Sequence, residues 1–297
     1  MKARAIGLAP LPSPLVESAV AAALAEDLGL IGDITTNATI PEEARAQGVI
    51  AARKAGCVCG IQLAHAAFRQ LDPGCRFDVV AVDGARVKAG EVVAVIAGNA
   101  RAVLSAERVA LNYMGRMSGI ATLTRQYVDA VAGTKARIVD TRKTTPGLRA
   151  FEKYAVRCGG GHNHRTGLFD AVLIKDNHIV AAGGVEQAVA AARQTAGHMI
   201  KIEVEIDTLD QLDAVLKYDV DAVLLDNMTT AQLREAVKRI DGRCLAEASG
   251  GVNLETVGAI AKTGVDLISV GALTHSAPVL DLGLDFSAQS TKRTLIA

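Results

Sequence analysis

The feature that most restricts the fold of this chain is an alternation of apolar runs and helical segments that begins after Gly133. Strand-like apolar runs lie at residues 136–139, 171–174, 200–206, 222–225, 244–248 and 267–270. Segments with helical spacing of apolar residues lie between the later runs, at 185–195, 209–217, 231–240 and 254–262. Apolar strands that alternate with helices are typical of a parallel sheet covered by helices. We therefore predict an α/β domain, either a barrel or an open doubly wound sheet.

The residues at the ends of these strands favour the barrel. Nearly every strand ends in a polar or glycine-containing sequence: Asp140-Thr-Arg-Lys143, Lys175-Asp-Asn-His178, Glu203-Val-Glu205, Asp226-Asn227, Ser249-Gly-Gly251 and Ser269-Val-Gly271. In an α/β barrel the carboxyl ends of all strands surround one site. In an open sheet they spread along an edge, and ligands bind at one switch point. Many polar strand ends are therefore better explained by a barrel.

The first hundred or so residues follow a different pattern. A helix is predicted at 13–29, because Ser13 can cap it, Pro14 suits its first turn and Gly29 would end it. Other predicted elements are strands at 47–53 and 77–82, a helix at 62–71, a β-hairpin at 83–98 and a long helix capped by Ser105. These elements indicate a smaller α+β domain.

Cationic side chains are concentrated in a short part of the chain: Arg142, Lys143, His164, Arg165 and Lys175. The whole chain has 32 Lys+Arg and 32 Asp+Glu, so this cluster does not reflect a basic background. A local positive site on a neutral protein indicates a small, multiply anionic ligand and not nucleic acid. Arginine binds carboxylate or phosphate through two parallel hydrogen bonds, whereas lysine supplies a point charge.

Two further groups at strand ends complete the predicted site. The turns Ser249-Gly250-Gly251 and Ser269-Val270-Gly271 follow the last two strands, where barrels often bind phosphate with backbone N–H groups. Glu205 and Asp226 end adjacent strands. They could hold sugar hydroxyls, position Mg²⁺ that arrives with a pyrophosphate, stabilise an oxocarbenium ion, or simply pair with nearby cations. No arrangement of Cys and His predicts a protein-held metal site.

The motifs around these residues resemble those of one family, the quinolinate phosphoribosyltransferases (carboxylating nicotinate-nucleotide diphosphorylases). The central motifs are Asp140-Thr-Arg-Lys-Thr-Thr-Pro-Gly-Leu-Arg149 and Lys153-Tyr-Ala-Val-Arg-Cys-Gly-Gly-Gly-His-Asn-His-Arg165. Supporting motifs are Glu26-Asp-Leu-Gly29, Gly32-Asp-Ile-Thr-Thr36, Glu107-Arg-Val-Ala-Leu-Asn112, Ser118-Gly-Ile-Ala-Thr122 and Ser269-Val-Gly-Ala-Leu273. The resemblance covers almost the whole chain.

The resemblance implies an incomplete α/β barrel at 117–275 and an amino-terminal α+β domain at 1–116, which residues 276–297 rejoin. It implies a pentosyltransferase that converts quinolinate and phosphoribosyl pyrophosphate to nicotinate mononucleotide, pyrophosphate and CO₂, with Mg²⁺ near Glu205 and Asp226. The residues implied to bind substrates are Arg108, Thr141, Arg142, Lys143, His164, Arg165, Lys175, Glu205, Asp226, Ser249, Gly250, Gly251, Ser269, Val270 and Gly271. Lys143, Glu205 and Asp226 are implied to be catalytic.

The family also implies a homodimer, with a hexamer as the larger alternative, in which Arg108 reaches the site of the neighbouring subunit. One implication conflicts with the strand count. In simple strand–helix alternation, residues 159–167 would lie at the amino end of the barrel, away from the site that the family assigns to His164 and Arg165. Either glycines 159–161 turn the chain back or the predicted strand boundaries are wrong.

Three alternatives remain open at this point. A paralogous phosphoribosyltransferase of the same fold, associated with molybdate transport, would differ in substrate. A lyase or isomerase could use Lys175 as a Schiff base. A biotinyl or lipoyl carrier would need an acceptor lysine at a hairpin tip, which Lys88 does not match well.

Charges or glycines interrupt every apolar stretch, so we expect neither a membrane span nor a signal peptide. The five cysteines have no zinc or redox spacing and are typical of a cytoplasmic protein.

Overall fold

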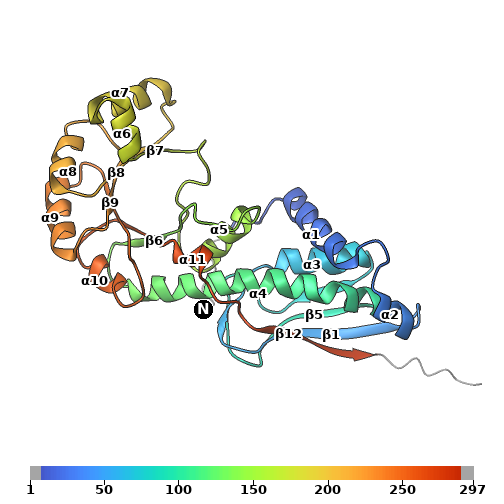
Figure 1. The fold of residues 1–297 in the computed structure, drawn as a ribbon. Coiled ribbons are helices and arrows are strands. Elements are labelled where there is room, and N and C mark those ends of the chain that lie inside the picture. Colours follow the sequence, from blue (N-terminus) through green and yellow to red (C-terminus); the bar gives the residue numbers. More distant parts are fainter. Residues whose placement is uncertain (1–7, 289–297) are drawn as a thin grey trace, which may run out of the picture. The chain divides into compact units, whose positions relative to one another are not determined.

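The computed structural model of the protein describes residues 8–288 (Figure 1). The chain divides into two compact units. The first contains the described residues up to Leu123, Arg157–Gly159 and the described residues from Ala277 onward. The second contains Thr124–Val156 and Gly160–Ser276. The finer boundary predicted at residues 116–117 stays a prediction. Among the residues that the structure describes, no helix is both long and apolar enough to span a membrane.

The first unit is built around an antiparallel sheet with the strand order β12-β1-β5-β3. Its elements are α1 (Ser13–Leu28), α2 (Ile34–Thr39), β1 (Arg45–Ala52), β2 (Gly56–Cys57), α3 (Ile61–Leu71), β3 (Arg76–Val79), β4 (Arg86–Val87), β5 (Val92–Asn99), most of α4 (Ala100–Ala130) and β12 (Leu282–Ala288). Strand β12, from the end of the described chain, pairs with β1 (Figure 1). The predicted α+β domain is confirmed.

Three local predictions for this unit were wrong. The N-cap of α1 is Pro12 and not Ser13, although Gly29 does end the helix with a φ of 54°. Helix α4 begins at Ala100, so Ser105 lies inside it, where its Oγ donates to Asp33 Oδ2 at 2.9 Å. The hairpin at 83–98 does not form, since β4 pairs with β2 while β5 pairs with β1 and β3. The apolar strand β5 gains two neighbours in the centre of the sheet, which outweighs local turn geometry.

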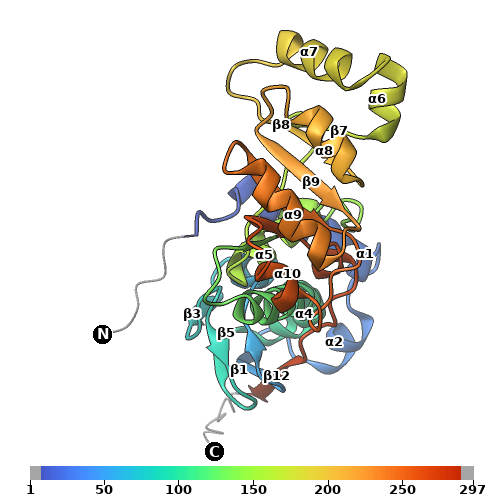
Figure 2. The same cartoon turned by 90° about the vertical axis from the view of Figure 1, so that its left-hand side faces the viewer.

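The second unit contains a parallel sheet with the strand order β6-β11-β10-β9-β8-β7. Its strands are β6 (Arg137–Val139), β7 (Val172–Ile174), β8 (Ile202–Ile206), β9 (Ala222–Asp226), β10 (Leu245–Ser249) and β11 (Leu267–Ser269). Its helices include α6 (Asp176–Ala182), α7 (Val185–Thr195), α8 (Leu209–Val215), α9 (Thr230–Ile240), α10 (Val257–Ala261) and α11 (Ala272–His275). Helices α7, α8 and α9 lie on the outer side of the strands (Figures 1 and 2).

A short seventh strand position resolves the conflict over residues 159–167. After helix α5 (Arg149–Cys158), the chain returns beside β6, where His162 forms a parallel bridge with Val139. The His162 amide donates to the Ile138 carbonyl at 2.8 Å, and the Asp140 amide donates to the His162 carbonyl at 3.1 Å. Residues 163–165 therefore follow the carboxyl end of a strand and not its amino end. The strand count made from the sequence missed this position because it is too short to show an apolar run.

The barrel is incomplete, as the family resemblance implied. Counted along the chain, its positions are β6, the His162 segment, and β7 to β11, and β11 closes the circle by pairing with β6. Among the described residues, no ladder joins the His162 segment to β7. The barrel is therefore open between its second and third positions.

Strand periodicity places charged side chains inside this barrel. On β8, the buried Ile202, Val204 and Ile206 alternate with Glu203 and Glu205. Successive side chains of a strand point to opposite faces, so the two glutamates share a face. Parallel pairing aligns Glu205 with Leu224 of β9, and Leu224 with Glu247 of β10. The face with Ile202, Val204 and Ile206 packs against the helices, while the face toward the barrel interior carries the glutamates.

We predict that Asp33→Ala lowers the free energy of unfolding by about 1 kcal/mol, because Asp33 is the N-cap of α2 and accepts from the Thr36 amide at 2.9 Å. Hydrogen bonds from Thr36 lower the pKa of Asp33 from 3.8, so its contribution is present at neutral pH and is lost as the pH falls through the folded-state pKa. Urea denaturation at pH 7 and pH 3 measures both effects. Asp33→Asn should retain most of the cap, and Ala in place of the exposed Asp27 should change stability by less than about 0.5 kcal/mol. A pH-independent loss would show that the carboxylate does not act as a cap.

Candidate active site

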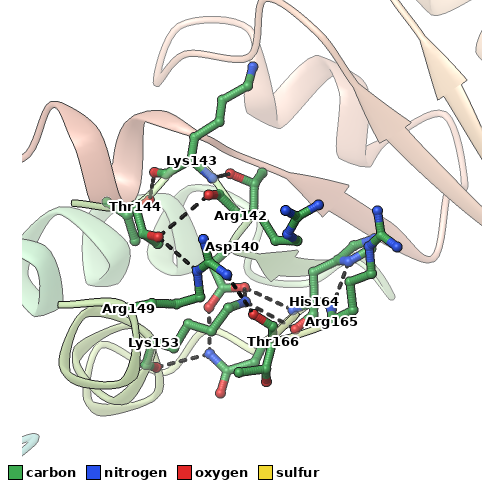
Figure 3. Close-up of polar contacts among 12 residues, drawn as sticks. Asp140, Arg142, Lys143, Thr144, Arg149, Lys153, His164, Arg165 and Thr166 are labelled. Carbon is green, nitrogen blue, oxygen red and sulfur yellow. Dashed lines mark hydrogen bonds and ion pairs between the residues drawn. The ribbon is translucent and has the colours of Figure 1, made fainter. Parts of the chain in front are cut away.

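A buried ion pair organises the end of β6. Lys153 of α5 and Asp140, which follows β6, form a salt bridge with side chains only 4% and 0% exposed. Asp140 also accepts from Asn163 Nδ2 at 2.5 Å and from the His164 amide at 2.9 Å, while Lys153 Nζ donates to the His164 carbonyl at 3.0 Å. Burial raises the pKa of Asp140, although Lys153 and these donors act in the opposite direction. The network joins β6, α5 and the His162 segment (Figure 3).

The two arginines of the cationic cluster lie close to each other. Burial and the charge of Arg142 lower the pKa of Arg165. The Nε atom of Arg142 is buried and has no hydrogen-bond partner among the described residues. A buried donor without an acceptor is costly, and two adjacent guanidinium groups repel each other. A bound anion such as a carboxylate would relieve both penalties.

The loop that carries Arg142 is held at several points. Thr141 Oγ1 accepts from the Lys143 amide at 3.0 Å. Arg149 donates from Nε to Thr144 Oγ1 at 2.9 Å and from a terminal nitrogen to the Thr166 carbonyl at 3.2 Å. These bonds connect the loop after β6 with the segment after His162 (Figure 3).

The Lys143 side chain lies outside this network, against the turn after β11. Its side chain extends away from Asp140 (Figure 3), and a Cβ added at Gly271 would lie 3.1 Å from Lys143 Cδ. Thr274 of α11 donates from Oγ1 to the Lys143 carbonyl at 2.7 Å. Because β6 and β11 are paired, Lys143 lies beside the predicted phosphate turn Ser269-Val270-Gly271.

The carboxylates predicted at the ends of β8 and β9 each have a polar partner. Lys175, which follows β7, donates from Nζ to Glu205 Oε2 at 2.5 Å. Asp226 Oδ2 accepts from Asn227 Nδ2 at 2.7 Å. The Glu205 side chain is 21% exposed, so it is not fully enclosed by the protein. The Lys175 amine is engaged by Glu205, an arrangement that does not favour its use as a Schiff-base nucleophile.

The turn after β10 requires glycine for steric reasons. Gly250 has a φ of 89°, and a Cβ there would lie 2.1 Å from Asn227 Oδ1. Gly251 has a φ of 61°, which also favours glycine. Ser249 and Gly250 therefore pack closely against the end of β9, whereas Gly251 faces open space.

Comparisons with known proteins agree with this architecture. The pattern described as "Quinolinate phosphoribosyl transferase, C-terminal domain" matches residues 120–285, and the corresponding N-terminal domain pattern matches residues 33–118. A Mycobacterium leprae protein named nicotinate-nucleotide pyrophosphorylase [carboxylating] is 48% identical over 268 residues, which cover 89% of this chain and 94% of that protein. A probable nicotinate-nucleotide pyrophosphorylase [carboxylating] from Bacillus subtilis is 44% identical and covers 88% of this chain and 89% of its own length.

The chain belongs to the quinolinate phosphoribosyltransferase family.

Solved structures of relatives share the fold of this family member. NadC from Streptococcus pyogenes superposes with a TM-score of 0.92 at 38% identity, covering 95% of this chain and 100% of that chain. The nicotinate-nucleotide pyrophosphorylase from Francisella tularensis has a TM-score of 0.90 at 38% identity, covering 96% and 100%. The incomplete barrel is therefore the fold of the family.

In this quinolinate phosphoribosyltransferase, the predicted site residues after β6 to β11 all lie in the second unit: Thr141, Arg142, Lys143, His164, Arg165, Lys175, Glu205, Asp226, Ser249, Gly250, Gly251, Ser269, Val270 and Gly271. Arg108 is on the part of α4 that belongs to the first unit. Contacts within the second unit connect the loop of Lys143 with the turn of Gly271, Lys175 with Glu205, and Gly250 with Asn227. The substrate contacts of all these residues stay predictions.

Two acidic residues inside the barrel were not among the predicted site residues, although Glu203 was noted in the polar strand end Glu203-Val-Glu205. Glu203 and Glu247 are 8% and 1% exposed, and His164 Nε2 lies 2.8 Å from Glu203 Oε2 and 3.7 Å from Glu247 Oε1. Burial and the neighbouring Glu203 raise the pKa of Glu247 to about 8. The signal was present in the sequence, since a glutamate in the middle of an apolar strand is unusual. The side-chain atoms of His164, Glu203 and Glu247 that could bind a metal lie within 4.8 Å of one another. The same is true of Cys59, Asp83 and Cys158 in the first unit.

We predict that breaking the buried pair Asp140–Lys153 lowers the free energy of unfolding by about 3–5 kcal/mol, because either single change leaves an uncompensated buried charge. Asp140→Asn and Lys153→Met should each show this loss in urea denaturation. The double variant should be less destabilised than the sum of the two.

The matched control is Lys135→Met, which breaks an ion pair with Asp266 in which the lysine is 58% exposed. It should change stability by less than about 1 kcal/mol. Strict additivity in the double variant would show that Asp140 and Lys153 do not act as a pair.

Proposed function

We propose that this chain is a decarboxylating quinolinate phosphoribosyltransferase. It transfers the phosphoribosyl group of phosphoribosyl pyrophosphate to quinolinate and releases nicotinate mononucleotide, pyrophosphate and CO₂. Membership of the family and the names of its relatives support this activity. The structural observation that carries it is the Arg142–Arg165 pair, in which a buried guanidinium donor lacks an acceptor among the described residues.

Recognition of quinolinate follows from the chemistry of this pair. Quinolinate carries two adjacent carboxylates, and guanidinium groups bind carboxylates through two parallel hydrogen bonds. Arg142 and Arg165 lie near each other, and Lys175 is held at the adjacent opening of the barrel by Glu205. A substrate with one carboxylate would leave at least one of these cations without a partner, which is unfavourable in a partly buried site.

The 5-phosphate of phosphoribosyl pyrophosphate is assigned to the turns after β10 and β11 at the barrel mouth. The turns 249–251 and 269–271 follow β10 and β11, and Lys143 lies against Gly271. Backbone N–H groups in glycine turns bind phosphate oxygens, and a nearby lysine adds charge. This arrangement supports binding of the 5-phosphate of the ribose there.

Departure of pyrophosphate leaves positive charge at ribose C1, which the ring nitrogen of quinolinate attacks. Glu205 and Asp226, from adjacent strands, provide negative charge for this centre. The same two carboxylates fit Mg²⁺, because this ion is usually held by one or two carboxylates together with substrate phosphates. When bound, Mg²⁺ neutralises charge on the pyrophosphate. Lys143 and the glycine turns hold the phosphates in line for the transfer.

Loss of CO₂ needs no covalent catalyst. Once the ring nitrogen is bonded to C1, the pyridinium accepts the electron pair left when the bond from C2 to its carboxylate breaks, and C2 then takes a proton. The protein's part is to hold the ring in place and to exclude water from the ylide. Arg142 and Arg165 fix the ring through its carboxylates.

Further parts of the proposal concern assembly and location. We propose a homodimer in which Arg108 serves the site of the neighbouring subunit, with Mg²⁺ as the cofactor. A cytoplasmic location also stays a prediction, based on the five free cysteines. Of the alternatives, the carrier loses its basis because Lys88 is not at a hairpin tip, since β4 and β5 do not pair. The names of the relatives from Mycobacterium leprae and Arabidopsis thaliana give no support to the molybdate-transport paralogue.

We predict that the protein forms nicotinate mononucleotide from quinolinate and phosphoribosyl pyrophosphate and does not use nicotinic acid. Each charge-assisted hydrogen bond that nicotinic acid fails to make should cost about 1–3 kcal/mol. Chromatographic detection of the product, together with trapping of ¹⁴CO₂ from carboxyl-labelled quinolinate, measures both events. Efficient use of nicotinic acid would overturn the proposed substrate.

We also predict that two inactive variants, Arg108→Ala and Lys143→Ala, complement each other when their subunits exchange. Each mixed dimer would contain one site that lacks both residues and one intact site. With random exchange of equal amounts, about half the dimers are mixed, so roughly a quarter of wild-type activity should return. Exchange is verified by native mass spectrometry of differently tagged chains. No recovery despite exchange would show that Arg108 does not act across an interface.

A further inference from the structure

The interior of the barrel holds two carboxylates that the proposed reaction has not used. Glu203 on β8 and Glu247 on β10 are both buried, and their Oε1 atoms have no hydrogen-bond partner within the described part of the chain. Barrel interiors are normally filled with branched apolar side chains. Carboxylates there are costly unless they hold something in place.

Glu203 and Glu247 both face the ring of His164. Its Nε2 lies 2.8 Å from Glu203 Oε2, and its Nδ1 accepts the backbone N–H of Arg165 at 2.7 Å. Because Nδ1 accepts a hydrogen bond, the ring proton is on Nε2 and is donated to Glu203. Both ring nitrogens are therefore engaged inside the protein. Glu247 Oε1 lies 3.7 Å from Nε2 on the same side of the ring.

The consequence concerns Arg165. Its backbone amide is bound by the His164 ring, and its guanidinium donates to the Ala171 carbonyl at 3.3 Å and lies near Arg142. The ring in turn is held on the barrel interior by Glu203. A chain of contacts thus runs from two strands in the barrel wall to the arginine assigned to the substrate carboxylate.

The pKa of the His164 ring reflects both its burial and its acidic neighbours. Burial alone would lower the pKa of His164, but the hydrogen bond to Glu203 and the charges of Glu247 and Glu203 raise it above its usual value. The contacts themselves select the tautomer, because a neutral ring with its proton on Nε2 can donate to Glu203 and accept from the Arg165 amide at the same time. Asp140 holds the His164 backbone from the other side.

We propose that Glu203 and Glu247 are positioning residues for quinolinate, which act through the His164 ring to fix the backbone of Arg165 so that its guanidinium meets a substrate carboxylate. This inference rests on the proposed function, and it adds specificity-determining residues that make no contact with the substrate. It implies that removing the carboxylates weakens quinolinate binding while leaving the phosphate side of the site intact.

The test compares Glu203→Met, which removes the hydrogen-bond acceptor, with Glu203→Gln, which keeps a carbonyl acceptor. Glu203→Met should raise the quinolinate Kd, measured by calorimetry, and its KM by about 10- to 100-fold. Glu203→Gln should restore much of this loss. The KM for phosphoribosyl pyrophosphate should change less than about twofold, a split that general damage to the fold would not produce. Glu203→Met leaves the buried His164 Nε2–H without its acceptor, so a lower melting temperature is expected for this variant than for Glu203→Gln.

A double-mutant cycle with Arg165→Ala identifies the route of the effect. If Glu203 acts through Arg165, the variant with Glu203→Met and Arg165→Ala should bind quinolinate no more weakly than Arg165→Ala alone. Additive losses would overturn the proposal. Asp266→Asn is the matched control, since Asp266 accepts from the Ala246 amide at the start of β10 and should not affect quinolinate binding.

Further outcomes separate this inference from its rivals. If Glu203→Met does not fold, Glu247→Met, which removes the carboxyl group 3.7 Å from His164 Nε2, decides the matter: wild-type quinolinate affinity in that variant overturns the proposal. Stoichiometric metal in the purified protein that is lost in Glu203→Met would also overturn it, in favour of a metal site at His164, Glu203 and Glu247. Wild-type protein that binds no quinolinate would overturn the proposed function itself, whereas equal affinity in wild type and Glu203→Met would overturn only this inference.

Discussion

The site depends on the buried pair of Asp140 and Lys153. One carboxylate receives Lys153 Nζ, Asn163 Nδ2 and the His164 amide, so β6, α5 and the His162 segment are fixed at a single point. The raised pKa of Asp140 shows that burial outweighs these partners. The pair is therefore better understood as a device that fixes geometry than as a source of net stability, in line with the behaviour of buried ion pairs.

Around this point, charge is arranged in two layers. The outer layer at the mouth of the barrel contains Arg142, Arg165 and Lys175, and an anionic substrate would balance it. The inner layer contains Glu203 and Glu247, which face the His164 ring. His164 belongs to the inner layer and the next residue, Arg165, belongs to the outer layer. The interior carboxylates can therefore orient the Arg165 guanidinium through the His164 ring without pairing with it. Glu205 differs, because it pairs directly with Lys175 at 2.5 Å.

Much of the architecture could be predicted from the sequence because it follows from local patterns. Apolar runs indicated the strands of the barrel, and the helix predicted at 185–195 has the bounds of α7. Failures occurred where long-range contacts compete with local signals. Strand β5 pairs with β1 and β3 and not with the adjacent β4, and Ser105 lies inside a helix that begins at Ala100. Short elements such as α2, α6 and α11 carry too few residues for a periodic signal.

The sequence by itself determined the fold class, the family and the identity of the charged residues at the strand ends. Only the tertiary structure decided how those residues meet. The return of His162 beside Val139 places His164 and Arg165 at the carboxyl end of the barrel, which strand counting had not allowed. Likewise, Glu203 and Glu247 are 44 positions apart in the chain, and only the parallel pairing of β8, β9 and β10 directs both toward one imidazole. Contacts of this kind depend on strand register, a long-range property that no local pattern encodes.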